Sequence, residues 1–131
     1  MIIQQISVFV ENKPGTLAEV LGVLKENEIN LRALSVADTA DFGILRMIVQ
    51  EPEKAERILR DADFTIKITP VLAIDLEDRP GNLYEYVQKL GTAGINIEYM
   101  YAFASIKDAK VVLKVDDLVR AKGIVNGDDP A

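Results

Sequence analysis

The chain has 131 residues, with 15 Lys or Arg, 21 Asp or Glu and a net charge of -6. It contains no Cys, His or Trp, which excludes disulfides, thiol nucleophiles and the Cys or His sites that hold transition metals. The acidic balance argues against a nucleic-acid binder, because phosphates require a basic surface.

No apolar run approaches the ~20 residues that a membrane span requires, because charged residues interrupt every one. Residues 1–5 lack the basic flank and the apolar core of a signal peptide. We therefore expect a cytoplasmic protein that contacts neither membrane nor nucleic acid.

The first half of the chain predicts the element order strand, helix, strand, strand, helix, strand. Residues 6–10 are β-branched and apolar, which is typical of a strand, and the Pro-Gly turn after them favours a helix start. We expect further strands at residues 30–37, 43–49 and 64–69, and a second helix that opens at residues 51–53. The apolar residues of the first helix recur at i, i+3, i+4 and i+7, namely Leu17, Val20, Leu21 and Leu24.

The second half repeats the first with an offset of 66 residues. Residues 11–30 and 77–96 share eight identities in twenty aligned positions, where ordinary composition gives about one or two by chance. The register continues without insertion, so we expect strands at residues 71–76, 96–104 and 109–115. The identical pairs are Glu11/Glu77, Pro14/Pro80, Gly15/Gly81, Leu17/Leu83, Glu19/Glu85, Leu24/Leu90, Ile29/Ile95 and Asn30/Asn96.

This element order predicts an α+β fold of two ferredoxin-like βαββαβ domains in tandem, at residues 1–69 and 70–131. Each antiparallel sheet carries both helices on one face and has the strand order 4-1-3-2. The fourth strand of the second copy maps to residue 130 onward, where the sequence ends, so this copy lacks its last strand. The edge of its first strand is then unpaired, unless a partner chain or residues 66–76 of a neighbour cover it; a truncated or divergent tail is the simpler alternative.

The two loops between the first strand and the first helix of each copy are the candidate binding sites. Gly15 and Gly81 permit a close backbone approach, and uncovered amides at a helix N-terminus favour an anion such as a carboxylate. A side-chain oxygen of Asn12 or Asp78 accepts a hydrogen bond from an ammonium group, so one loop can hold both ends of an amino acid. The alternative is an ordinary helix start, with Asn12 or Asp78 as the cap and the proline in the first turn.

Both copies share an apolar strand, the loop [Asn/Asp]-[Lys/Arg]-Pro-Gly-x-Leu, an amphipathic helix and then Ile-Asn-[Leu/Ile]. Over about residues 4–125 this pattern resembles the ACT domain, and the whole chain resembles a stand-alone tandem pair of such domains. The resemblance implies an allosteric regulatory protein that binds an amino acid or another small ligand and modulates an enzyme of amino-acid metabolism.

The resemblance also implies that two domains pair through their second strands into one eight-stranded sheet, within one chain or between the chains of a homodimer. Ligand then lies between the loop of one domain and the start of the second strand in the other. The residues implied in ligand binding are Asn12, Lys13, Pro14, Gly15, Thr16, Leu17, Asn30, Leu31, Asp78, Arg79, Pro80, Gly81, Asn82, Leu83, Asn96 and Ile97.

The second strands carry apolar residues on both predicted faces, which suggests cover from another surface. Strict alternation places Leu31 with Ala33 and Ser35 in the first copy, and Ile97 with Tyr99, Tyr101 and Phe103 in the second. We interpret these aromatic residues as core, with the hydroxyls of Tyr99 and Tyr101 as candidate ligand contacts.

Three other classes of function remain as alternatives. The first alternative is a structural or dimerisation module, which uses the same fold only as an interface. The second is a carboxylate-dependent enzyme, which the absence of His and Cys disfavours. A ferredoxin-like RNA binder lacks its basic, aromatic third strand. We expect no catalytic residue, no metal and no cofactor. The Asn12-Lys13 and Asp78-Arg79 loops differ in charge, so the two sites are not equivalent, and one functional site is as consistent with the sequence as two.

Overall fold

The computed structural model describes residues 1–39, 41–104 and 109–127, which form six strands and four helices. None of the helices in these ranges is long and apolar enough to cross a membrane. The elements are β1 (Ile2–Glu11), α1 (Thr16–Glu26), β2 (Leu31–Asp38), β3 (Phe42–Val49), α2 (Pro52–Asp61), β4 (Thr65–Leu76), α3 (Asn82–Thr92), β5 (Ile97–Ala104), β6 (Ala109–Val115) and α4 (Leu118–Asn126).

The chain divides into two compact units. The first unit is Gln4–Thr69, and the second unit combines Met1–Ile3 with Pro70–Ala131. The strands β1 and β4 therefore each contribute residues to both units. Each unit has its own hydrophobic core and is described by itself below.

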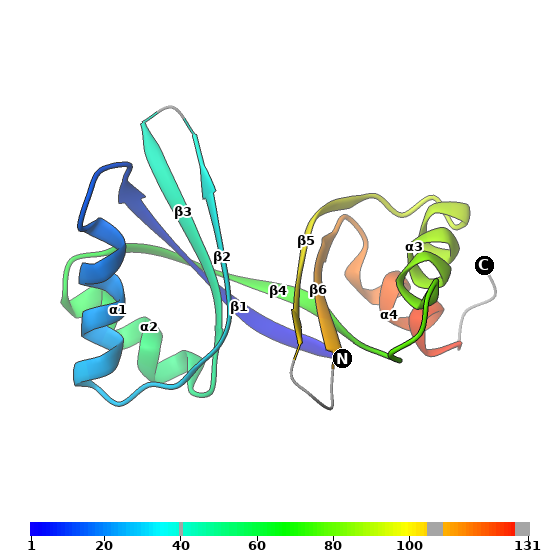
Figure 1. The fold of residues 1–131 in the computed structure, drawn as a ribbon, viewed down its shortest axis with the longest axis horizontal. Coiled ribbons are helices and arrows are strands. Elements are labelled where there is room, and N and C mark those ends of the chain that lie inside the picture. The colour runs from blue at the N-terminus through cyan, green and yellow to red at the C-terminus, as the bar shows by residue number, and fades with distance from the viewer. Residues whose placement is uncertain (40, 105–108, 128–131) are drawn as a thin grey trace. The chain divides into compact units, whose positions relative to one another are not determined.

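The first unit has the strand order β2-β3-β1-β4, which is the predicted order 4-1-3-2. Figure 1 shows α1 and α2 on one face of these strands. Alternate residues of β1 point toward the helices and are buried, because successive side chains of a strand face opposite sides of the sheet. The predicted α+β ferredoxin-like fold is confirmed. The fully buried or nearly buried core residues include Ile6, Val8, Val20, Leu24, Leu45, Met47, Ala55 and Leu59.

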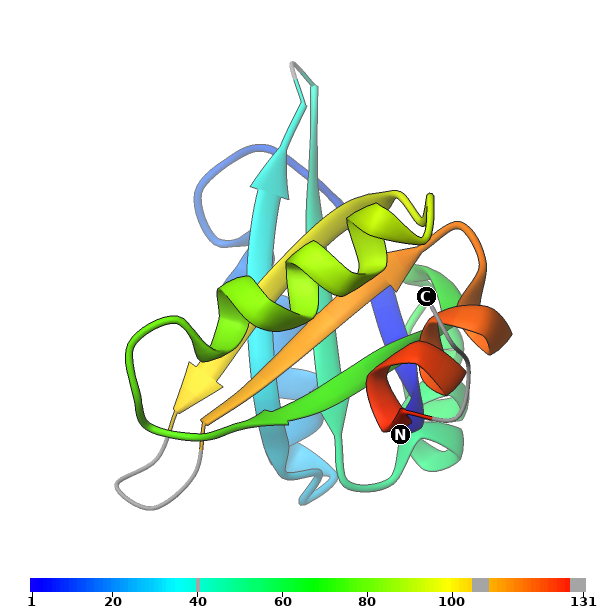
Figure 2. The same cartoon turned by 90° about the vertical axis from the view of Figure 1, so that its right-hand side faces the viewer.

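In the second unit β6 lies between β4 and β5, and α3 and α4 cover one face of these strands, as Figure 2 shows. The pairing of β4 with β6 and of β6 with β5 is antiparallel, so the first three strand positions repeat those of the first unit. The core residues sit at positions equivalent to those of the first unit, and include Leu72, Ile74, Leu90, Ile95, Val111, Leu113, Ala121 and Ile124.

The fourth strand position of the second unit is taken by the beginning of the chain. The N–H of Ala73 donates to the carbonyl oxygen of Met1 at 2.8 Å, and the Met1 ammonium donates to the carbonyl oxygen of Ala73 at 3.1 Å. The expectation of an unpaired edge is therefore wrong for this part of β4, and the occupant is neither a second chain nor residues 66–76. Residues 128–131, where the sequence placed the missing strand, lie outside the described residues.

The reason for this difference is the length of β1. The sequence predicted a first strand at residues 6–10, but β1 begins at Ile2, so its first residues extend beyond the first unit. Ile2 and Ile3 are β-branched, which favours a strand, but an edge pairing across more than 70 residues leaves no local pattern.

A β-bulge interrupts β2 after its first residue. Leu31 pairs with Val49 of β3, whose side chain lies in the core, whereas Ala33 pairs with Ile48 on the opposite face of the sheet. Strict alternation along residues 31–35 was therefore a wrong prediction, because the extra residue, Arg32, moves Leu31 to the helical face.

The same bulge recurs in β5. Ile97 pairs with Val115 and packs against the second core, whereas Tyr99 pairs with Lys114 on the face away from α3 and α4. Tyr101 and Phe103 follow Tyr99 at alternate positions and share that face. The interpretation of these three aromatic residues as part of the helix-covered core was wrong.

Candidate functional site

The two candidate loops connect β1 to α1 and β4 to α3, and each ends on a glycine. Gly15 has φ 91° and Gly81 has φ 86°, so both lie in the left-handed region that favours glycine. Among the residues that the structure describes, and apart from the adjoining backbone, no atom lies within 4 Å of the position that a Cβ would take at either residue. The glycines are therefore required by the backbone conformation and not by crowding, and the space beside them is open.

Both helices begin later than the sequence predicted. The N-cap residues are Gly15 and Gly81 themselves, and neither helix has a side-chain cap. The alternative in which Asn12 or Asp78 caps the helix is therefore wrong. The first amides of α1 and α3 keep the partial positive charge of a helix N-terminus without a side-chain cap, which suits an anionic group, although the N–H of Asn82 donates to the carbonyl of Arg79 at 3.4 Å.

A buried polar side chain holds each loop against the end of its strand. The Thr16 hydroxyl lies 2.8 Å from the Glu11 carbonyl oxygen and 3.1 Å from that of Lys13, and donates toward both. In the second unit, Asn82 Oδ1 accepts the N–H of Glu77 at 2.7 Å. The two residues occupy equivalent positions and are 8% and 5% exposed, so different chemistry closes the same turn.

The charged residues of the second loop form a connected cluster. Arg79 donates from Nη1 and Nη2 to the two carboxylate oxygens of Glu85 at 2.9 and 2.8 Å, and from Nε to Glu77 at 2.8 Å. These hydrogen bonds lower the pKa of Glu85 and raise that of Arg79, with Glu85 as the main cause of the latter shift. Glu85 was not among the predicted site residues, although the identity of Glu19 and Glu85 between the repeats was a usable signal.

The first loop lacks this cluster. Lys13 Nζ lies 3.1 Å from a carboxylate oxygen of Glu11, and both side chains are more than half exposed. Glu19, the equivalent of Glu85, forms no ion pair with any residue within the described part of the chain. A hollow of about 230 Å³ opens beside this loop and is lined by Phe9, Val10, Glu11, Lys13, Thr16, Glu19, Asp63, Phe64 and Thr65.

Neither unit brings its own loop and its own Ile-Asn motif together. In the first unit the N–H of Asn12 donates to the carbonyl of Asp41 at one end of the sheet, and the carbonyl of Asn30 accepts from Gln50 at the other end. Leu31 starts β2 at that second end.

The second unit repeats this separation. The carbonyl of Asn96 accepts the N–H of Asp116 at 3.2 Å, and its N–H donates to the Asp116 carboxylate at 3.1 Å. Ile97 follows at the start of β5, whereas the loop at residues 78–81 follows the other end of the sheet, where Leu76 pairs with Ala109. The predicted combination of one domain's loop with the other domain's second strand stays a prediction.

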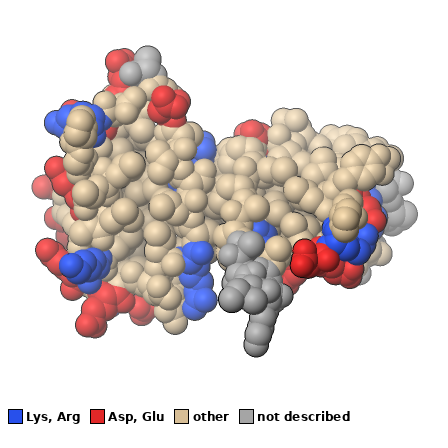
Figure 3. Space-filling view, viewed as in Figure 1, with Lys and Arg blue, Asp and Glu red and all other residues tan. Residues whose placement is uncertain are grey.

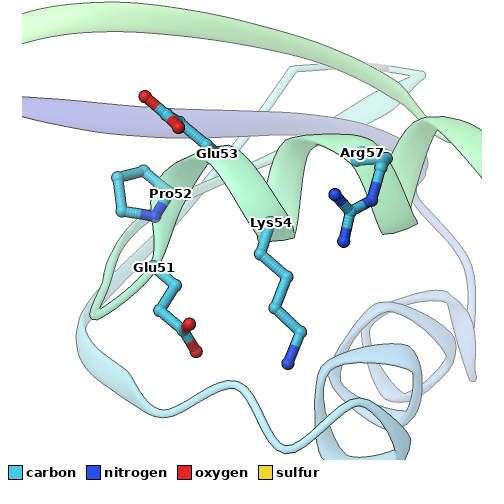
Figure 4. Close-up of a pocket in the computed structure, with 5 residues that line it drawn as sticks. All are labelled: Glu51, Pro52, Glu53, Lys54 and Arg57. Carbon is cyan, nitrogen blue, oxygen red and sulfur yellow. The ribbon is translucent and has the colours of Figure 1, made fainter.

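A second hollow lies at the start of α2, with a volume of about 450 Å³. Figure 4 shows that its side chains diverge: Glu53 points to one side of the helix, and Glu51 and Lys54 point to the other. The described residues contain no group of three acidic side chains placed to hold a metal ion. In Figure 3 the charged side chains of the first unit gather around its helices and its rim, whereas the surface over β2 and β3 is largely uncharged.

Comparisons with known proteins agree with this architecture. A family model described as an ACT domain pair matches residues 1–129. The crystal structure of protein BT0572 from Bacteroides thetaiotaomicron is 42% identical, covers 97% of this chain and 88% of its own, and superposes with a TM-score of 0.92. The ligand-free regulatory subunit of aspartate kinase from Thermus thermophilus shares the fold at a TM-score of 0.71, with 16% identity and coverage of 96% and 93%.

A curated relative, a probable acetolactate synthase small subunit from Archaeoglobus fulgidus, is 31% identical over 78 residues. That match covers 55% of this chain and 49% of the relative, so the chain spans about half the length of the protein that it matches. The family model, in contrast, extends over both repeats. The chain therefore belongs to the ACT domain pair family.

Proposed function

We propose that this ACT-domain protein is a regulatory protein that binds an amino acid and modulates an enzyme of amino-acid metabolism. The observation that carries the proposal is the uncapped helix N-terminus behind a left-handed glycine, which both units repeat. The relatives support the choice of ligand and partner, because one is named as a subunit of acetolactate synthase and another as the regulatory subunit of aspartate kinase.

The loop chemistry suits the two charged groups that every amino acid carries. The ligand carboxylate accepts hydrogen bonds from the first amides of α1, which have no side-chain cap, and the helix dipole favours its charge. The ligand ammonium donates to the side-chain oxygen of Asn12. The Ile-Asn segment of a second domain, in the same chain or in the second chain of a homodimer, then completes the site.

The residues that we propose for ligand binding are those of the two loops and of the two second-strand starts. They are Asn12, Lys13, Pro14, Gly15, Thr16, Leu17, Asn30 and Leu31, and their equivalents Asp78, Arg79, Pro80, Gly81, Asn82, Leu83, Asn96 and Ile97. We assign none of them a catalytic role, because the arrangement offers a binding surface for charged groups and no nucleophile beside a base.

The test is thermal unfolding of the protein with each of the twenty amino acids at millimolar concentration. A ligand that is present at about 1,000 times its dissociation constant stabilises the folded state by about 4 kcal/mol, and the melting temperature rises accordingly. We expect one amino acid, or a small group of similar ones, to raise it. If none of the twenty does, the sensor function fails and the fold serves only as an interface.

A further inference from the structure

We infer that the second loop is occupied by the protein's own carboxylate, Glu85, so that the amino acid binds only beside the first loop. This inference rests on the proposed function and specifies which of the two repeated sites performs it. It follows from a difference between loops that otherwise have the same backbone, with glycines at φ 91° and φ 86°.

In the second loop, Arg79 donates three of its five N–H groups to the carboxylates of its neighbours. Both terminal guanidinium nitrogens bind Glu85 in a two-point arrangement, and Nε binds Glu77. Such paired contacts are stronger and more directional than single ones. Glu85 also lies in the first turn of α3, where the helix dipole favours a negative charge. The loop therefore already holds a carboxylate where a ligand carboxylate would be attracted.

Asn82 strengthens this arrangement from inside the loop. Its Oδ1 accepts the N–H of Glu77 at 2.7 Å and so holds the end of β4 against the start of α3. The pKa of Glu85 is lowered first by Arg79 and to a smaller extent by Asn82. An incoming anion must break the two-point contact of Glu85 with Arg79 to take its place, and it meets the repulsion of that carboxylate when it approaches.

In the first loop the equivalent residues cannot form this cluster. Lys13 carries a single ammonium group, which cannot bind a carboxylate at two points as the planar guanidinium group of an arginine does. Among the residues that the structure describes, it pairs only with the exposed carboxylate of Glu11. The hydroxyl proton of Thr16 is directed at two backbone carbonyls, and Glu19 forms no ion pair with the other described residues. An exposed pair of one Lys and one carboxylate is weak, and a ligand carboxylate can compete for Lys13.

The space around the first loop is also consistent with a ligand. The hollow of about 230 Å³ there includes Lys13 and Thr16 from the loop, with Phe9 and Phe64 as apolar wall. Two of the three substitutions between the loops, Lys13 for Arg79 and Thr16 for Asn82, therefore separate an open loop from one that is closed by its own side chains.

The experiment is an NMR titration of the ¹⁵N-labelled full chain with an equimolar mixture of the twenty amino acids. The observed signals are the backbone amides of residues 15–17 and 81–83. We compare the wild type with Glu85→Ala, which releases both terminal nitrogens of Arg79 at an exposed position. The control is Gln88→Ala, which removes an exposed polar side chain one turn further along α3 and leaves Glu77 and Glu85, the partners of Arg79, in place.

The inference predicts chemical-shift changes only at residues 15–17 in the wild type and in Gln88→Ala, and at both loops in Glu85→Ala. Changes at both loops of the wild type would overturn the inference and leave the sensor function intact. Changes at the first loop alone in Glu85→Ala would also overturn it, because the carboxylate would then not be what closes the second loop. A titration that changes no loop amide in any of the three proteins would refute the sensor function itself.

Discussion

At the residue scale, some features of the two loops could be predicted from the sequence and others could not. The Pro-Gly pair predicted a turn with an open backbone, and Gly15 and Gly81 adopt the left-handed conformation that only glycine takes easily. The roles of Thr16 and Asn82 were not predictable, because each hydrogen-bonds a backbone group whose position depends on the folded turn. Arg79 lies in the loop and Glu85 lies six residues later in α3. Their pairing could not be predicted, because it follows neither the period of a helix nor that of a strand.

Replacing Thr16 with valine tests the closure of the first loop. Valine has almost the same shape but removes the hydroxyl donor from the carbonyls of Glu11 and Lys13, of which the former keeps the N–H of Lys13. We therefore expect the free energy of unfolding to fall by about 1–2 kcal/mol. Urea denaturation measures the change, with Thr92→Val at the exposed end of α3 as the control. Equal losses in both variants would show that the hydroxyl of Thr16 does not hold the loop.

The acid dependence of stability tests the Arg79–Glu85 pair. The pKa of Glu85 is lowered from its ordinary value of 4.5, first by the hydrogen bonds from Arg79. A lowered folded-state pKa contributes stability that is fully present above pH 4.5 and is lost as the pH falls through the folded-state value. We therefore expect the wild type to lose stability more steeply than Glu85→Ala as the pH falls below 4.5.

Chemical denaturation at a series of pH values measures the free energy of unfolding of the wild type and of Glu85→Ala. Because both side chains of the pair are about half exposed, the difference should shrink when salt is added. If the free energy of unfolding falls equally steeply with decreasing pH in the two proteins at low salt, Glu85 is not a paired carboxylate.

At the element scale, the predictable part of the fold was the order and type of the elements. The i, i+3, i+4 spacing located α1 and α3, and the β-branched runs located the strands. The bulges in β2 and β5 were not predictable, because Arg32 and Glu98 have nothing in their side chains that marks an extra residue. The strand that completes the second unit was missed because Met1–Ile3 and Ala73 are distant in the sequence.

Removal of residues 1–3 tests this strand. The amide of Ala73 donates to the Met1 carbonyl, so the deletion should expose that amide to solvent and speed its hydrogen exchange. Amides of β3 in the first unit, such as that of Leu45, serve as the internal control. Unchanged exchange at Ala73 would show that residues 1–3 do not form the fourth strand of the second unit in solution.

At the scale of the whole molecule, a duplicated sequence has produced two units with the same architecture and different loops. The duplication was visible in the sequence as a constant offset of 66 residues, and it predicted the fold of both units and the location of both loops. It did not predict that the loops differ in their internal contacts. That difference depends on two substitutions, Lys13 for Arg79 and Thr16 for Asn82, whose effect appears only when the side chains are in place.

The most direct test of the account is calorimetric titration of three proteins with the amino acid that gives the largest thermal stabilisation. Gly15→Val places a side chain in the open space of the first loop, whereas Gly94→Val imposes the same kind of backbone strain, at φ 78°, after α3. The account predicts that the wild type and Gly94→Val bind the amino acid and that Gly15→Val, although folded, does not. Equal affinity in Gly15→Val and in the wild type would contradict it.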